Sequence, residues 1–151
     1  MIDKNKEIKT RIFNSIMKNG KKRTGEKILL KSLKEIQKRS MKKTSNIISI
    51  AIKHTTPTLK LDHQKLKKKK RKTVQEIPTF IKNNFLRVNL SIKSIIINSK
   101  NNNTATTFSL KLANEFLNST KLKSSSVEQV IEMQKQILSK RNVFFKYRWK
   151  K

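Results

Sequence analysis

Apolar residues recur every three or four positions through the first third of the chain, which is the spacing of amphipathic helices. The pattern predicts three helices, around residues 8–17, 24–36 and 44–52. Gly20 lies where a left-handed C-cap would end the first helix. Thr24 can N-cap the second helix, with Glu26 in its first turn, and Thr44 or Ser45 opens the third.

After Pro57 the pattern changes from helical spacing to alternation. Residues 58–61 and 73–77 alternate apolar and polar side chains, which is typical of short strands. Between them lies "KLKKKKRK" (65–72), in which seven of eight residues are basic. We therefore expect an antiparallel hairpin that carries the basic run at its far end.

Helical spacing returns at Pro78, which suits the first turn of a long helix that reaches Ile96. The pattern then predicts a loop at 98–103 and two more helices, at 108–117 and 125–138. Ser125 and Glu128 form a capping box at the start of the last helix. The predicted fold class is mainly α, a six-helix bundle with a β-hairpin arm inserted between helices 3 and 4. We expect one domain over residues 1–151, with the arm at about 58–78.

The charge of the chain indicates its partner. The chain has 38 Lys and Arg against 9 Asp and Glu, which gives a formal net charge of +29 and a pI near 10.8. Such a balance surrounds the protein with a positive field, so we expect a polyanion as partner. Leu, Ile, Val and Phe together exceed the roughly 20% of residues below which highly charged chains stay disordered. We therefore expect a folded protein of limited stability, because its charges repel one another.

The absence of cysteine excludes disulfides and thiolate chemistry. No apolar run approaches the length of a transmembrane helix, so we expect no membrane partner. The N-terminal "MIDKNKEIKTR" lacks the apolar core of a signal peptide, and Asp3 and Glu7 argue against a mitochondrial presequence.

Lys, Asn and Ile dominate the composition, which is typical of an AT-rich genome. These features fit a gene kept and translated inside an organelle, and they fit an AT-rich cell almost as well.

The sequence offers little catalytic chemistry. His54 and His63 lie far apart without the spacing of metal ligands, and Asp62 and His63, as neighbours in a strand, point to opposite faces. Glu128 and Glu132 lie one turn apart on an ordinary charged helix face, and the two glycines form no phosphate-binding loop. We expect no enzymatic activity, no cofactor and no metal site.

The basic run has three interpretations: a solvated loop, a nuclear-localisation signal, or an arm whose lysines neutralise phosphates and release counterions. The flanking strands and Pro78 favour an anchored element over a solvated loop. Near the C-terminus, Phe144, Phe145, Tyr147 and Trp149 could stack on bases. Most aromatic residues at the end of a domain pack, and packing is the favoured interpretation for the two phenylalanines.

Four segments carry a resemblance to a known family: "IFNSIMKNGKKRTGEKIL" (12–29), "AIKHTTPTLKL" (51–61), "LKLANEF" (110–116) and "FFKYRW" (144–149). In this order and at nearly these intervals they resemble ribosomal protein S7, the head protein of the small subunit. The resemblance implies a six-helix bundle with a long β-hairpin arm between helices 3 and 4. It also implies binding to the 3′ major domain of small-subunit rRNA, early nucleation of head assembly, and an arm that lines the exit-tRNA site and the mRNA path.

Individual positions match the family's motifs. They are Gly20, Lys21 and Lys22 in the basic loop after helix one, Pro57 before the arm, Arg87 in helix four, residues 112–115 in helix five, and 147–149 at the carboxyl end. Elsewhere the chain departs from the family. Few residues precede helix one, lysines replace Gly-Gly at the hairpin tip, Phe80 and Ile81 replace an arginine pair, and Lys135 replaces a histidine. A redistribution of charge of this kind fits an organellar copy.

We therefore predict a structural rRNA-binding protein of an organellar small ribosomal subunit. The alternative is a nuclear architectural nucleic-acid-binding protein that uses "KKKKRK" for import. The predicted RNA-binding residues are Lys21, Lys22, Arg23, Lys65, Lys67, Lys68, Lys69, Lys70, Arg71, Lys72, Lys82, Arg87, Lys111 and Arg148. The expected partners are small-subunit rRNA and neighbouring head and platform proteins, with exit-site tRNA and mRNA nearby. The expected compartment is the mitochondrion, ahead of a plastid or the cytoplasm of an AT-rich cell.

Overall fold

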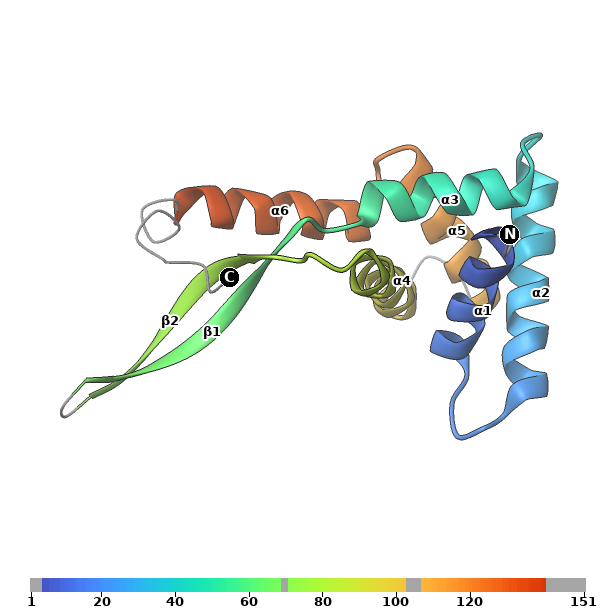
Figure 1. The fold of residues 1–151 in the computed structure, drawn as a ribbon. Helices are drawn as coiled ribbons and strands as arrows, with labels where there is room; N and C mark the ends of the chain where they lie inside the picture. The colour runs from blue at the N-terminus through green and yellow to red at the C-terminus, as the bar shows by residue number, and fades with distance from the viewer. Residues whose placement is uncertain (1–3, 69–70, 103–106, 141–151) are drawn as a thin grey trace.

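The computed structural model describes residues 4–68, 71–102 and 107–140, and Figure 1 shows their arrangement. The elements are α1 Lys4–Ile16, α2 Lys22–Arg39, α3 Thr44–Thr55, β1 Leu59–Lys68, β2 Arg71–Phe80, α4 Asn84–Asn101, α5 Phe108–Thr120 and α6 Ser125–Ser139. The predicted fold class is confirmed: the protein is mainly helical, with six helices and a two-stranded antiparallel hairpin between helices 3 and 4.

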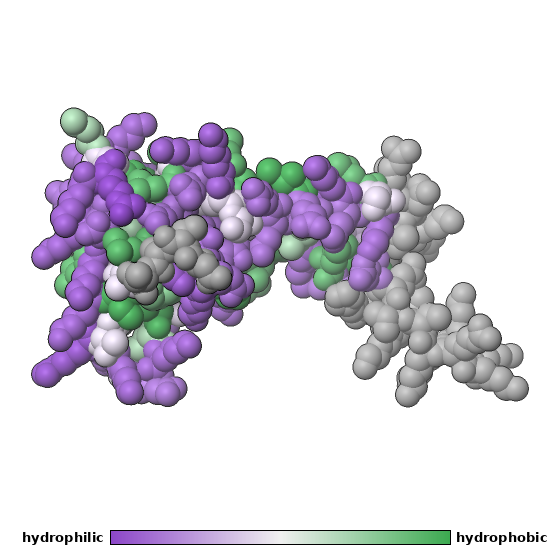
Figure 2. Space-filling view, turned by 180° about the vertical axis from the view of Figure 1, so that it is seen from behind, coloured by the Kyte–Doolittle hydropathy of each residue, from purple (hydrophilic) through white to green (hydrophobic). Residues whose placement is uncertain are grey.

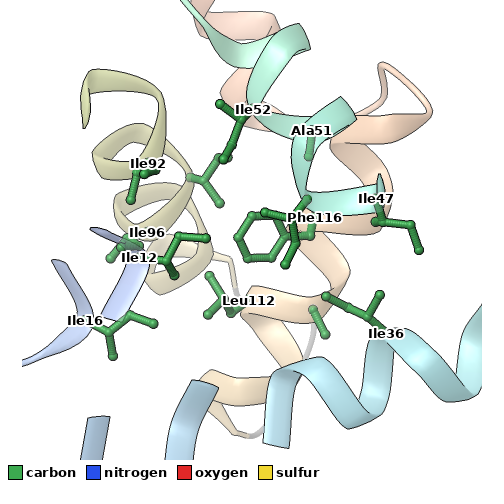
Figure 3. Close-up of a cluster of buried hydrophobic side chains, with 13 residues drawn as sticks. Ile12, Ile16, Ile36, Ile47, Ala51, Ile52, Ile92, Ile96, Leu112 and Phe116 are labelled. Atoms are coloured by element: carbon green, nitrogen blue, oxygen red, sulfur yellow. The ribbon is translucent and has the colours of Figure 1, made fainter. Parts of the chain in front are cut away.

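The hydrophobic core lies around α5, which packs against α2, α3 and α4. Leu112 and Phe116, one turn apart on α5, are 0% and 2% exposed, and Phe116 lies at the centre of the cluster in Figure 3. The other core residues come from all four preceding helices and, for Ala113, from α5 itself: Ile12, Ile16, Ile36, Ile47, Ile48, Ala51, Ile52, Ile92, Ile95, Ile96 and Ala113. Their spacing of three and four residues is the one from which the helices were predicted.

Helix α6 lies outside this core and links the bundle to the hairpin. In Figure 1 it extends away from the end of α3 and lies beside the base of the hairpin, where it packs against β1. Asn98 on α4 and Gln129 on α6 exchange two amide hydrogen bonds of 2.9 and 3.0 Å. At the far end of the helix, Lys140 forms an ion pair with Glu76 of β2. The helix therefore braces the hairpin from one side.

The hairpin is longer than the sequence pattern indicated. Its ladder runs from Leu59 opposite Phe80 to Lys68 opposite Arg71, so each strand has ten residues and spans roughly 30 Å. The prediction of strands at 58–61 and 73–77 was too short, because most of the basic run lies within the strands. A two-stranded ribbon that projects into solvent needs no buried face, so apolar alternation does not mark its length.

Pro78 does not begin a helix, which corrects the prediction. It lies in β2 opposite Leu61, and α4 begins only at Asn84. A proline can occupy an edge strand because the amide that it lacks would face outwards from the ladder. Asn83 provides the N-cap, with its side-chain oxygen accepting a hydrogen bond of 2.8 Å from Phe85 N.

Other predicted boundaries were also displaced. Helix α2 begins at Lys22, so Thr24 is not its N-cap and Glu26 is not in its first turn. Helix α4 continues to Asn101, into the segment 98–103 that was predicted to be a loop. Ser124, rather than Ser125, caps α6 by accepting a hydrogen bond of 3.2 Å from Val127 N. The third helix begins at Thr44, one of the two predicted residues.

Gly20 has the predicted left-handed conformation, with φ of +69°. Helix α1 already ends at Ile16, however, so the glycine lies in the loop rather than at the C-cap. Asn19 before it also has a positive φ, of +51°. The two residues form the turn that leads the chain into α2.

Candidate nucleic-acid interface

The hairpin arm carries five of the eleven predicted RNA-binding residues that lie in the described structure. Lys65, Lys67 and Lys68 lie on β1, and Arg71 and Lys72 lie on β2. The register places Lys67 opposite Lys72 and Lys68 opposite Arg71 at the end of the ladder farthest from the bundle. Like charges at directly opposed positions destabilise a ladder, so an anion that compensates the charge would stabilise this end.

Several predicted residues lie outside the described part of the chain. They are Lys69, Lys70, Arg148, and the aromatic residues Phe144, Phe145, Tyr147 and Trp149. Their role in RNA binding stays a prediction.

Hydrogen bonds at the base of the arm hold it to the bundle. Arg87 Nε on α4 donates to the carbonyl oxygen of Pro57 at 3.3 Å, and its Nη1 donates to Asn84 Oδ1 at 3.3 Å. Ile81 N donates to the carbonyl oxygen of Thr58 at 3.1 Å, which extends the pairing below the ladder. Arg87, predicted from the sequence to contact RNA, thus also positions the arm.

Asp62, on the first strand, links the two strands of the hairpin near its base. Its carboxylate accepts a hydrogen bond of 2.8 Å from Thr79 Oγ1 and lies 2.8 Å from Lys60 Nζ. This arrangement assigns Asp62 a structural role.

A cleft beside the arm gathers further cations. It is formed by α1, the end of α3 and the start of α4, and it is lined by Arg11, Lys53 and Arg87. The Arg11 guanidinium lies over the ring of Phe85, 3.9 Å from the ring centroid, and also pairs with Glu7. The ring is 51% exposed, so one of its faces holds a cation while the rest remains accessible to solvent.

Sequence reasoning missed Arg11 and Lys53. Both lie on helices whose apolar stripes were identified, but neither lies on the stripe itself. No motif of the sequence singles them out, because their proximity to Arg87 depends on how α1, α3 and α4 pack.

The end of the α1–α2 loop and the first residues of α2 carry the second group of predicted residues. Lys21, Lys22 and Arg23 are all exposed, and the turn is closed by a hydrogen bond of 3.0 Å from Lys21 N to the carbonyl oxygen of Lys18. In Figure 1 this loop and the hairpin arm point to the same side of the molecule from its two ends, with α4 between them. The exposed Lys82 lies in the connection between β2 and α4.

Lys111 lies on α5, where it is half-buried. In Figure 1 α5 lies on the opposite side of α4 from the hairpin.

The described residues offer no catalytic or metal-binding cluster. In that part of the chain no three His, Asp or Glu residues could hold a metal ion, and no helix is long and apolar enough to cross a membrane. His54 instead joins two helices, with its Nδ1 2.9 Å from the carbonyl oxygen of Ser119.

Comparison with known proteins decides the family. The family model described as "Ribosomal protein S7p/S5e" matches residues 2–141. The chain belongs to this family. A mitochondrial relative, "Small ribosomal subunit protein uS7m" of Reclinomonas americana, is 28% identical over 145 residues, which are 96% of this chain and 87% of the relative.

Membership of the S7 family makes this chain a small-subunit ribosomal protein, and not an enzyme. It also implies binding of small-subunit rRNA within the ribosome. A basic arm and a basic loop on one side of a helical bundle are the features with which such a protein can hold RNA.

The positions that resemble the S7 helix-five signature form part of the bundle's interior. Leu112 and Ala113 are core residues, and Asn114 accepts a hydrogen bond from Arg39 of α2. Glu115 is fully buried, and its Oε1 accepts bonds of 3.2 Å from Ser126 N and 2.6 Å from Ser126 Oγ. This part of the resemblance therefore reflects folding rather than RNA contact.

Proposed function

We propose that this chain binds the 3′ major domain of small-subunit rRNA, nucleates assembly of the subunit head, and lines the exit-tRNA and mRNA region with its arm. The observation that carries the proposal is the basic hairpin, about 30 Å long, that projects from a bundle of the S7 family. Residues Lys21–Arg23 and the cleft at Arg87 provide further cations.

The mechanism is electrostatic and depends on shape. A-form RNA has a deep, narrow major groove that side chains hardly reach, so the lysines of the arm act on phosphates. Phosphate contacts fix the position of a protein on RNA without reading its sequence. The packed core and the anchored base of the arm hold the cations at fixed separations, so that only an RNA of the right shape meets all of them.

We place the protein in the mitochondrial small subunit, among the neighbouring head and platform proteins, acting as one domain over residues 1–151. The mitochondrial relative and the composition typical of an AT-rich genome support this compartment. Family membership favours the ribosomal hypothesis over a nuclear architectural protein. Co-sedimentation with small subunits from purified mitochondria, read by mass spectrometry, tests the compartment. Its recovery only from nuclear chromatin would contradict the proposal.

The RNA-binding proposal is tested by replacing Lys67, Lys68, Lys69 and Lys70 with Ala. Each neutralised phosphate contributes about 0.7–0.9 to the slope of log affinity against log salt, so the slope should flatten by roughly 2–4 units. The loss should be similar for RNAs of different sequence. Helix content should not change, because a solvated arm buries little.

The matched control replaces four exposed lysines away from the arm, Lys42, Lys100, Lys121 and Lys123, with Ala. This variant should retain most of the wild-type slope. A slope for the arm variant equal to that of the wild-type protein would leave the basic run as a solvated loop.

A further inference from the structure

A row of cations continues from the basic loop along α2. Arg23, Lys27, Lys31, Lys34 and Lys38 follow one another at intervals of four, four, three and four residues, which places them on one face of the helix. All five are exposed. The row covers about 22 Å at the helical rise, with neighbours about 5–6 Å apart.

The row is poorly compensated by the protein itself. Glu35 lies at its end, 3.2 Å from Lys38 Nζ and 4.0 Å from Arg39 Nη2. Lys27, Lys31 and Lys34 form no ion pair with any carboxylate of the described residues. Like charges one turn apart destabilise a helix, so the row weakens α2 until an anion occupies it.

Lys27, Lys31, Lys34 and Lys38 of this row line a groove rather than a convex helix surface. The floor of the groove includes the half-buried Ile28, and its second wall is the start of α5, where Thr107, Phe108 and Ser109 lie. A helix face that only contacts solvent would not require a second element beside it to form a groove. A groove with cations on one side and hydroxyl groups on the other can hold an extended anionic strand.

The row lies at the end of the molecule opposite the arm. Figure 1 shows α2 and the hairpin at the two extremes, and Figure 2 shows mostly hydrophilic side chains over the end that α2 forms. The phosphates that the row would neutralise are therefore distinct from those at the hairpin tip.

We propose that the groove between α2 and the start of α5 binds the sugar-phosphate backbone of a second RNA segment, which enters at the basic loop. The regular spacing of the cations matches a backbone with one charge per nucleotide better than an acidic protein segment, whose charges are irregular. This inference rests on the proposed rRNA-binding function. Its consequence is that the protein joins two RNA segments across its whole length, rather than holding one segment with its arm.

The experiment measures the salt dependence of binding to a transcript of the 3′ domain of the small-subunit rRNA. The full chain carries Lys27→Gln, Lys31→Gln and Lys34→Gln, which remove charge and retain good helix formers. We expect the slope of log affinity against log salt to flatten by about 2–3 units. A variant with Arg at these three positions should keep the wild-type slope, and so should one with Gln at the exposed Lys100, Lys121 and Lys123.

A photocrosslinking residue at position 31 identifies the occupant of the groove in assembled small subunits. A crosslink to rRNA supports the proposal, and a crosslink only to another protein overturns it. An unchanged slope in the α2 variant, with a flattened slope in the arm variant, overturns this inference alone. A wild-type protein whose binding of the transcript does not depend on salt overturns the proposed function as well.

Discussion

Leu122 is a non-glycine residue with a positive φ, of +60°. It follows α5, where Lys123 N donates to the carbonyl oxygen of Asn118 at 3.0 Å and Leu122 N donates to that of Ser119 at 3.3 Å. This pair of hydrogen bonds defines a Schellman motif, in which the position of Leu122 is usually a glycine. The side chain is 57% exposed, so little burial offsets the strain.

We expect Leu122→Gly to stabilise the protein by about 0.5–1 kcal/mol. A left-handed conformation costs an L-residue about 1–2 kcal/mol, of which the greater freedom of glycine in the unfolded chain offsets a part. Denaturant unfolding measures the difference, with Leu122→Ala as the control, since alanine keeps the strained conformation. Equal stability of the two variants would show that the backbone is not strained at this residue.

At the scale of elements, Glu115 connects α5 to α6. Besides its two bonds to Ser126, its Oε2 accepts a bond of 3.3 Å from Asn102 Nδ2 at the end of α4. The carboxylate lies at the N-terminus of α6, where the helix dipole favours a negative charge. A buried acid in a strongly basic protein is therefore explained by the helix end that it completes.

Glu115→Ala should destabilise the protein on the order of 2–4 kcal/mol, because it leaves the buried amide and hydroxyl of Ser126 without their acceptor. Thermal or denaturant unfolding measures the loss. Glu128→Ala is the matched control, since Glu128 is exposed in the first turn of the same helix and should contribute less than about 1 kcal/mol. Comparable losses in the two variants would contradict a special role for Glu115.

The attachment of the arm gives a second prediction at this scale. Arg87→Lys keeps the charge but cannot reproduce both the bond to Pro57 and the bond to Asn84, because lysine lacks the planar fork of donors. We expect RNA affinity to fall several-fold while the salt slope stays within about one unit of the wild-type value. Filter binding at several salt concentrations separates the two quantities.

Lys82→Ala provides the contrast, since Lys82 is exposed in the connection before α4. It should lower the slope by about 0.7–0.9 units without lowering stability. If Arg87→Lys binds RNA as tightly as the wild-type protein, then Arg87 acts through its charge and does not position the arm.

At the scale of the whole molecule, the net charge of +29 determines how the free protein responds to salt. Self-repulsion destabilises the compact state, and screening shortens its range from about 10 Å at 0.1 M to about 3 Å at 1 M ionic strength. We expect sodium chloride to stabilise the free protein on the order of 1 kcal/mol over this range, a rise in Tm of about 2–4 °C. Thermal unfolding monitored by circular dichroism measures it.

The variant with alanine at Lys67, Lys68, Lys69 and Lys70 should show a smaller rise, because less charge remains to be screened. A fall in Tm with added salt would mean that favourable ion pairs, rather than repulsion, dominate the electrostatics of the fold.

The sequence by itself determined the kind and order of the elements, the expectation of a polyanionic partner, and the resemblance to the S7 family. The spacing of Ile12 and Ile16, or of Leu112 and Phe116, depends only on the local geometry of a helix, so it can be read without a structure. Net charge is likewise a property of composition. The family comparison confirms the identity that these patterns indicated.

Only the tertiary structure decided how far the hairpin extends, where Pro78 lies, and what Arg87 and Glu115 do. The ladder pairs Leu61 with Pro78, Arg87 reaches Pro57, and Glu115 reaches Ser126. Each of these contacts joins residues from different elements of the chain. Hydrophobic periodicity reports which face of an element is buried, but it carries no information about which polar groups come into contact when the elements pack. Those polar contacts set the geometry of the arm and of the helix ends.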